Sequence, residues 1–191
     1  MCPCKGTALF WKRKDFMKTV KRLVYSALLL ALALVLPFLT GQIPQIGSAL
    51  SPMHIPVLLC GFVCGAPWGM AVGLIAPIMR SLLFQMPPMW PTAFAMAFEL
   101  AAYGFATGLL YKLLPKKNIM IYVNLVTSML IGRVVWGLVR FLIAGLGGSE
   151  FSIALFVAGA FTQAIPGIIL HIVLIPILVM ALKKGKILLN D

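Results

Sequence analysis

Residues 92–114, TAFAMAFELAAYGFATGLLYKLL, and residues 119–146, IMIYVNLVTSMLIGRVVWGLVRFLIAGL, are two apolar runs joined by the short basic stretch PKKN at 115–118. A helix crosses the ~30 Å hydrocarbon core of a bilayer with about 20 apolar residues. Both runs reach that length, and the proline that opens the linking stretch favours a turn between two helices. This part of the chain therefore predicts two membrane-crossing helices connected by a charged loop.

Further apolar runs repeat this pattern, and together they predict an all-α integral membrane bundle of about six transmembrane helices. The composition agrees, because 62% of the 191 residues are hydrophobic and only 10% are charged, against ~25% in ordinary soluble domains. A soluble domain of this size could not cover so much apolar surface. We expect a membrane domain at 19–185, a basic N-terminal tail at 1–18 and a C-terminal tail at 186–191. The further runs are 20–39, 53–64, 68–84 and 151–182.

The basic side chains predict which loops face the cytoplasm. Thirteen of the sixteen lysines and arginines lie at 5–22, at 112–117 or at 183–186, whereas the loops at 41–52, 85–91 and 147–150 contain none. Because cytoplasmic loops are enriched in Lys and Arg, both termini are expected inside a multi-pass protein of the cell membrane. A nucleic-acid binder would instead gather its cations on one folded face, so the net charge of +12 does not predict that function. No small-x-small cleavage site follows the first run, so this run is expected to be retained as a helix.

Ionisable residues inside the apolar runs are the candidates for function, because a central charge costs at least ~2.5–3.5 kcal/mol to insert. Arg133, Trp136 and Arg140 share one helix face by their spacing. Glu99 and Arg140 lie at similar depth when counted from the outer ends of their runs, so the sequence suggests that they pair. The set is His54, Arg80, Glu99, Arg133, Arg140 and His171.

The charge balance of this set predicts the chemistry of a ligand. Three arginines stand against one glutamate on the outer half, and unpaired charge away from water is unfavourable. Either water fills an outer cavity or an anionic ligand completes the set. Arginine binds carboxylate and phosphate with two parallel hydrogen bonds, which favours a small anionic or zwitterionic solute. Arg80, near the outer end of its run, is expected either to serve this site or to reach the membrane interface.

The remaining polar residues have more than one interpretation. His54 follows the first outer loop, where it would bind a ligand or cap the helix that begins there. His171 is flanked by aliphatic residues and is expected to be packed and neutral. Gln163 and Asn124 would line the cavity or hydrogen-bond between helices, and Trp136 would stack on a ligand ring.

The sequence contains no known catalytic motif. HExxH, GxSxG and the P-loop are absent, and no apolar run contains an aspartate. The cysteines, which are Cys2, Cys4, Cys60 and Cys64, do not match metal-ligand spacings. We therefore expect neither an enzyme, nor a cofactor, nor a metal site. Two alternatives remain open, which are an intramembrane enzyme with an unfamiliar site and a stand-alone proton-coupled carrier that uses Glu99.

The first apolar run contains Ala27 and Ala31, a pair of small residues four apart that lets another helix approach closely. This pair, the chain length, the number of runs and the stretch MHIPVLLCGFVCG at 53–65, followed by Trp68-Gly69, resemble one family. The chain resembles the substrate-binding S components of energy-coupling factor (ECF) vitamin transporters over about residues 17–185.

The resemblance implies a fold, a site and partners. Such proteins capture a vitamin from outside in a cavity between the outer halves of the fourth, fifth and sixth helices, which the loop at 41–52 would cap. The face with Ala27 and Ala31 would meet a transmembrane coupling subunit, whose two ATPase subunits supply the energy. The chain is most similar to pantothenate-type members, while pyridoxine, a hydroxymethylpyrimidine and a queuosine precursor stay open. The substrate residues that the resemblance implies are Glu99, Trp136, Arg140 and Gln163, with Arg133 and His54 behind them.

Overall fold

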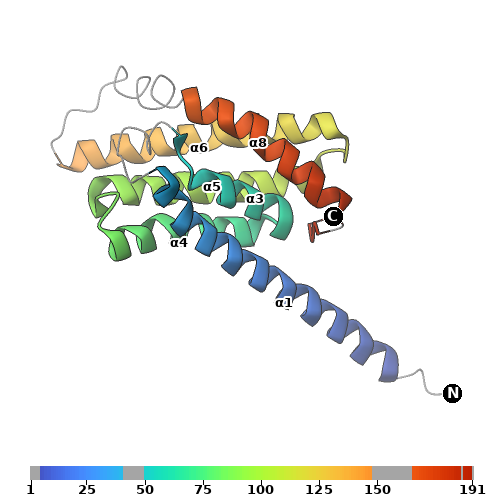
Figure 1. Ribbon diagram of the computed structural model, residues 1–191. Helices are drawn as coiled ribbons and strands as arrows, with labels where there is room; N and C mark the ends of the chain where they lie inside the picture. Colours follow the sequence, from blue (N-terminus) through green and yellow to red (C-terminus); the bar gives the residue numbers. More distant parts are fainter. Residues whose placement is uncertain (1–4, 41–49, 148–164, 186, 191) are drawn as a thin grey trace.

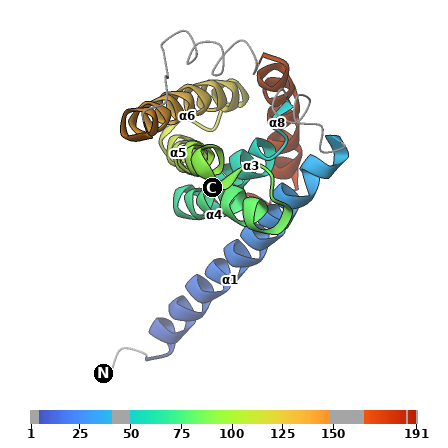
Figure 2. The same cartoon turned by 90° about the vertical axis from the view of Figure 1, so that its left-hand side faces the viewer.

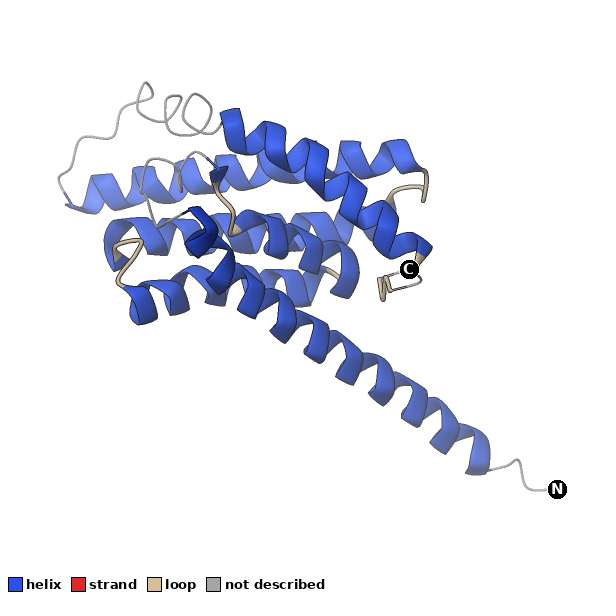
Figure 3. Ribbon diagram, viewed as in Figure 1, coloured by secondary structure: helices blue, strands red, loops and turns tan. Residues whose placement is uncertain are grey.

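The computed structural model describes residues 5–40, 50–147, 165–185 and 187–190. Within these ranges all regular structure is helical, as Figure 3 shows, which confirms the predicted all-α class. Two short irregular helices, η1 (Leu36–Thr40) and η2 (Met89–Ala93), extend α1 and precede α5. The α-helices are α1 (Lys5–Val35), α3 (His54–Cys64), α4 (Ala66–Phe84), α5 (Phe94–Leu113), α6 (Asn118–Gly147) and α8 (Ile165–Lys184) (Figure 1).

Five helical segments are long and apolar enough to cross a membrane, which confirms a multi-pass membrane protein. The α3 helix has only 11 residues, or about 16 Å at 1.5 Å per residue, and is too short to cross alone. Every residue of α3 is buried, so the other helices enclose it. The five segments are Phe16–Phe38, Ala66–Phe84, Met89–Leu113, Asn118–Gly145 and Ile165–Lys184.

The helix boundaries agree with the sequence prediction except near the ends of the chain. The first helix begins at Lys5, within the predicted N-terminal tail. The last helix is described from Ile165 onward, and residues 151–164 of its predicted run lie outside the described residues. The start of α1 and the end of α8 point to the same end of the bundle (Figure 1). We call this the cytoplasmic end, following the distribution of basic residues.

Glycines bring α3, α4 and α5 into close contact. A Cβ atom on Gly69 would lie 2.6 Å from the Gly104 carbonyl oxygen and 2.9 Å from the Gly61 Cα, so only hydrogen fits there. Gly65 ends α3 with φ of 97°, a conformation that other residues rarely adopt, and α4 begins directly after it. Small residues allow such backbone approach between membrane helices. The glycines of the 53–69 stretch therefore set how α5 lies against α3 and α4.

Buried hydrogen bonds join α5 to α6. The Asn124 side-chain amide donates to the Thr107 carbonyl at 3.0 Å, and Ser128 Oγ donates to Asn124 Oδ1 at 3.0 Å. All three residues are at most 1% exposed. Of the two roles that the sequence left open for Asn124, the structure shows the bond between helices.

Arg80 of α4 contacts the end of α1 through a hydrogen bond and cation–π contacts. Its Nη1 donates to the Leu34 carbonyl at 2.9 Å, and its guanidinium carbon lies 5.5 Å and 5.6 Å from the ring centroids of Phe38 and Phe84. Pro37 has no N–H to offer the Leu34 carbonyl in the 3₁₀ turn that follows, so the arginine supplies a donor. Arg80 is buried in these contacts, so the structure shows it joining α1 to α4, and its place relative to the membrane interface stays a prediction.

The end of the chain packs on the cytoplasmic end of the bundle. The Leu189 amide donates to the Val63 carbonyl at 2.9 Å, and Arg22 Nη2 donates to the Leu189 carbonyl at 2.9 Å. The Asn190 side chain donates to the Gly108 carbonyl at 3.0 Å. The described part of the predicted C-terminal tail thus connects α1, α3 and α5.

Candidate functional site

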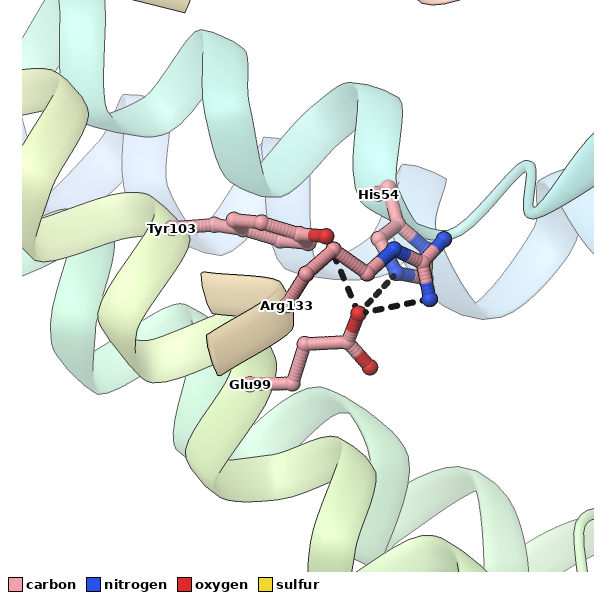
Figure 4. A network of polar contacts seen from close by, with 4 residues as sticks. All are labelled: His54, Glu99, Tyr103 and Arg133. Atoms are coloured by element: carbon pink, nitrogen blue, oxygen red, sulfur yellow. Dashed lines mark hydrogen bonds and ion pairs between the residues drawn. The ribbon is translucent and has the colours of Figure 1, made fainter. Parts of the chain in front are cut away.

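Glu99 is the acidic residue inside the membrane spans that the structure describes, and several groups converge on it. Arg133 Nη1 of α6 lies 3.0 Å from Glu99 Oε1, and the Tyr103 hydroxyl donates to the same oxygen at 2.9 Å. His54 Nε2 of α3 lies 3.7 Å from it, as Figure 4 shows. Tyr103 follows Glu99 by one helical turn, which places both on one face of α5. The cluster therefore joins three helices at one carboxylate oxygen.

The electrostatics explain why Glu99 can be buried here. Its side chain is 2% exposed, and an isolated buried carboxylate would be strongly unfavourable. The arginine supplies the opposite charge with a charge-assisted contact, and the tyrosine supplies a neutral donor. The ion pair is complete before any ligand arrives, so Glu99 is neutralised by the protein itself.

Several nitrogen atoms of the same cluster are buried without a hydrogen-bond partner among the described residues. They are His54 Nδ1, His54 Nε2, Arg133 Nε and His171 Nε2. The 3.7 Å between His54 Nε2 and Glu99 is too long for a hydrogen bond. Buried polar atoms are nearly always satisfied in folded proteins, and each unsatisfied one calls for an explanation. A polar ligand that forms hydrogen bonds with these nitrogen atoms would explain why they are buried.

The rings of two histidines on different helices, His54 and His171, stack in this cluster. The centroids of His54 and His171 are 5.8 Å apart with an interplanar angle of 28°, and the His54 ring lies 5.3 Å from that of Tyr103. His171 is buried, as expected, but it belongs to the Glu99 cluster rather than to plain aliphatic core. Met53 occupies the N-cap of α3, where no side-chain cap bond forms, so the alternative that His54 caps this helix is wrong.

Trp136 and Arg140 continue the face of α6 that begins with Arg133. The Arg140 guanidinium carbon lies 6.0 Å from the centroid of the Trp136 ring, within the range of a cation–π contact. The predicted pairing of Glu99 with Arg140 is wrong, because Arg133 is the arginine at the Glu99 carboxylate. Gln163 and most of the 41–52 cap lie outside the described residues.

Counting from the tight turn, instead of from the outer helix ends, identifies the correct arginine. Glu99 precedes Pro115 by 16 residues, and Arg133 follows Lys117 by 16. Antiparallel helices joined by a short loop keep equal depth from that loop. The outer ends of α5 and α6 do not lie at equal distance from the turn, because α6 extends to Gly147 while α5 begins at Phe94, after η2. Depths counted from those ends therefore do not match. Sequence reasoning also missed Tyr103, although its spacing of four from Glu99 was a usable signal.

The family model described as ECF transporter, substrate-specific component, matches residues 21–179, most of the chain. The chain belongs to this family. The search of curated proteins and the search of solved structures each found no match.

As an ECF S component, the chain is a transport subunit of the membrane and not an enzyme. The family implies a small-molecule substrate and an ECF module as partner. The intramembrane-enzyme alternative is therefore set aside. The Glu99 cluster, which α3, α5, α6 and α8 build together, is the candidate substrate site of the S component.

Proposed function

We propose that this S component captures a carboxylate-bearing vitamin, with pantothenate favoured, from the outer side of the membrane. The observation that carries the proposal is the group of buried nitrogen atoms around Glu99 that have no hydrogen-bond partner among the residues that the structure describes. A neutral histidine offers one donor and one acceptor, and Arg133 Nε offers a donor. A ligand rich in hydroxyl and amide groups matches this mixed set.

The second part of the proposed site is the Arg140–Trp136 pair. Arg140 follows Arg133 by seven residues on α6, which corresponds to about 10 Å along the helix axis. An elongated ligand would place its carboxylate on Arg140 and its hydroxyl groups among the histidines. Pantothenate has this distribution, with a carboxylate at one end and hydroxyls at the other. Glu99 already neutralises Arg133, so we assign the carboxylate to Arg140, and we keep Gln163 as a further candidate contact.

Flat heterocycles are the alternative substrates. Pyridoxine, a hydroxymethylpyrimidine or a queuosine precursor would stack on Trp136 or on the histidine pair and would use Glu99 to accept hydrogen bonds. Those ligands lack the carboxylate that we assign to Arg140. Their binding would therefore depend on the aromatic residues more than on Arg140.

The proposed partner surface lies on α1. Ala27 and Ala31 are both exposed, and α1 extends away from the rest of the bundle, as Figures 1 and 2 show from two sides. Leu23, one helical turn before Ala27, is also exposed. We assign this face to the transmembrane coupling subunit, with two ATPase subunits behind it, because small residues let two helices pack closely.

Calorimetric titration of the purified S component in detergent tests the proposal. We expect pantothenate to bind with submicromolar affinity, and Arg140→Gln to weaken binding by about tenfold or more, as expected for a lost charged hydrogen bond. Lys112→Gln is the matched control, because it removes the same charge from an exposed site at the other end of α5. Binding of a heterocycle instead, with full affinity in Arg140→Gln, would overturn the carboxylate assignment. Uptake by the chain alone in liposomes under a proton gradient would favour the carrier alternative.

A further inference from the structure

Tyr103 contacts both Glu99 and His54 in the candidate site. Its hydroxyl donates to Glu99 Oε1 at 2.9 Å, and the centroid of its ring lies 5.3 Å from that of His54. Tyr103 is 1% exposed, so its hydroxyl cannot turn toward the surface of the protein. The residue is therefore placed to control how these two side chains meet each other.

Three donors approach a single oxygen of the Glu99 carboxylate. Arg133 Nη1 at 3.0 Å and the Tyr103 hydroxyl at 2.9 Å are within bonding distance of Oε1. His54 Nε2 stays at 3.7 Å, and the second carboxylate oxygen points away from all three groups (Figure 4). A carboxylate oxygen accepts about two hydrogen bonds. The arginine and the tyrosine thus occupy Oε1, and the histidine is left outside.

A glycine on α6 provides the space for the tyrosine ring. Gly132 is buried, and a Cβ atom on it would overlap the ring of Tyr103. The bond from the Asn124 side chain to the Thr107 carbonyl, at 3.0 Å, holds α6 in register with α5 nearby. Any residue larger than glycine at position 132 would displace the ring, and the hydroxyl would leave the carboxylate with it.

The exclusion of His54 from Glu99 affects what a ligand can bind. Both ring nitrogens of His54 lack a hydrogen-bond partner among the described residues. If the Tyr103 hydroxyl were removed, His54 Nε2 would be the nearest replacement donor for Oε1. A movement of about 1 Å would bring it within bonding distance. The nitrogen would then be used by the protein instead of by a ligand.

We propose that Tyr103 is a positioning residue of the substrate site. Its hydroxyl holds Glu99 Oε1 and so keeps His54 available to the ligand, while Gly132 makes room for its ring. The effect on the ligand rests on the proposed function. The competition between Tyr103 and His54 for Glu99 takes place in the protein alone and is measured without a ligand.

Calorimetric titration with pantothenate measures the effect on binding. Tyr103→Phe should weaken binding about tenfold, whereas Tyr111→Phe, which removes the hydroxyl of another buried tyrosine on α5, should leave it unchanged. The double variant His54→Phe/Tyr103→Phe should bind as His54→Phe does, because the hydroxyl acts through His54. A further tenfold loss in the double variant would overturn the positioning role, since the hydroxyl would then act on the ligand directly.

Nitrogen-15 NMR of histidine-labelled protein tests the competition without a ligand. The chain has two histidines, so the ring signals are few, and His171→Phe assigns them. In Tyr103→Phe the Nε2 signal of His54 should shift as this atom bonds to Glu99, and in Tyr111→Phe it should not. An unchanged signal in Tyr103→Phe would overturn the proposal. A shifted signal in a protein that binds no pantothenate would support the competition and refute the substrate assignment alone.

Gly132→Ala tests the space around the ring. The added methyl group should reproduce both the weaker binding and the His54 signal shift of Tyr103→Phe. Gly145→Ala, on the same helix with nothing within 4 Å of its added Cβ, should produce neither. Normal binding with an unshifted signal in Gly132→Ala would contradict the role of the glycine. If melting curves show that Gly132→Ala does not fold, Tyr103→Phe, which keeps the ring in place, decides the proposal.

Discussion

Arg133 Nη1 on α6 lies 3.0 Å from Glu99 Oε1 on α5, and the Glu99 side chain is 2% exposed. The pair joins two antiparallel helices at equal distance from the tight turn between them. Tyr103 and His54 approach the same oxygen from α5 and α3. The ion pair therefore organises the candidate site, and within it Glu99 balances the charge of Arg133.

Arg133→Met should destabilise the protein by about 3–5 kcal/mol, because it leaves Glu99 as a buried charge without its partner. Adding Glu99→Gln should recover much of this loss, since a neutral amide replaces the stranded carboxylate. The Tm values of the single and double variants in detergent test the coupling. Simply additive losses would show that the pair is not coupled in this way.

His171→Phe should weaken substrate binding by about tenfold, because it removes a ring nitrogen that we assign to the ligand. The Tm should change little, because phenylalanine removes both the buried Nε2, which has no hydrogen-bond partner among the described residues, and the hydrogen bond of the ring with the Ser51 backbone, while the ring stack on His54 remains. Calorimetry and thermal unfolding of the same preparation measure both effects. A lower Tm with unchanged affinity would indicate that His171 serves the fold alone.

Gly104→Ala should destabilise the bundle by about 1–3 kcal/mol, as expected for overpacking. A Cβ on Gly104 would meet the backbone of Gly69, which cannot move aside as a side chain can. Gly145→Ala is the matched control, because nothing lies within 4 Å of its added Cβ. That control should be neutral or stabilising by up to about 1 kcal/mol from helix propensity. Equal Tm values for the two variants would contradict close packing at Gly104.

Ala31→Trp should prevent assembly with the ECF module but leave substrate binding unchanged, because Ala31 is exposed on α1 and remote from Glu99. A large side chain would keep the partner helix from approaching closely. Leu28→Trp, at an exposed position outside the alanine pair, is the control and should assemble. Co-purification with the coupling subunit measures the difference. Normal assembly of Ala31→Trp would move the partner surface elsewhere.

The fold class was predictable because its signals are local. The length of each apolar run and the proline and glycine breaks predicted the described helices within a few residues, from α3 through α6. The role of Arg80 was not predictable in this way. Its partner, the Leu34 carbonyl, is 46 residues away in the sequence, and it comes within reach only through the packing of α1 on α4.

The sequence by itself determined that the chain is a helical membrane protein, which residues cross, and which family it resembles, because hydropathy, length and charge asymmetry act along the chain. Only the tertiary structure decided that Arg133 meets Glu99 and that His54 stacks on His171. These contacts depend on how each helix is rotated and how closely it packs. Steric contacts between distant residues, such as Gly69 against Gly104, set that rotation, and hydropathy carries no information about it.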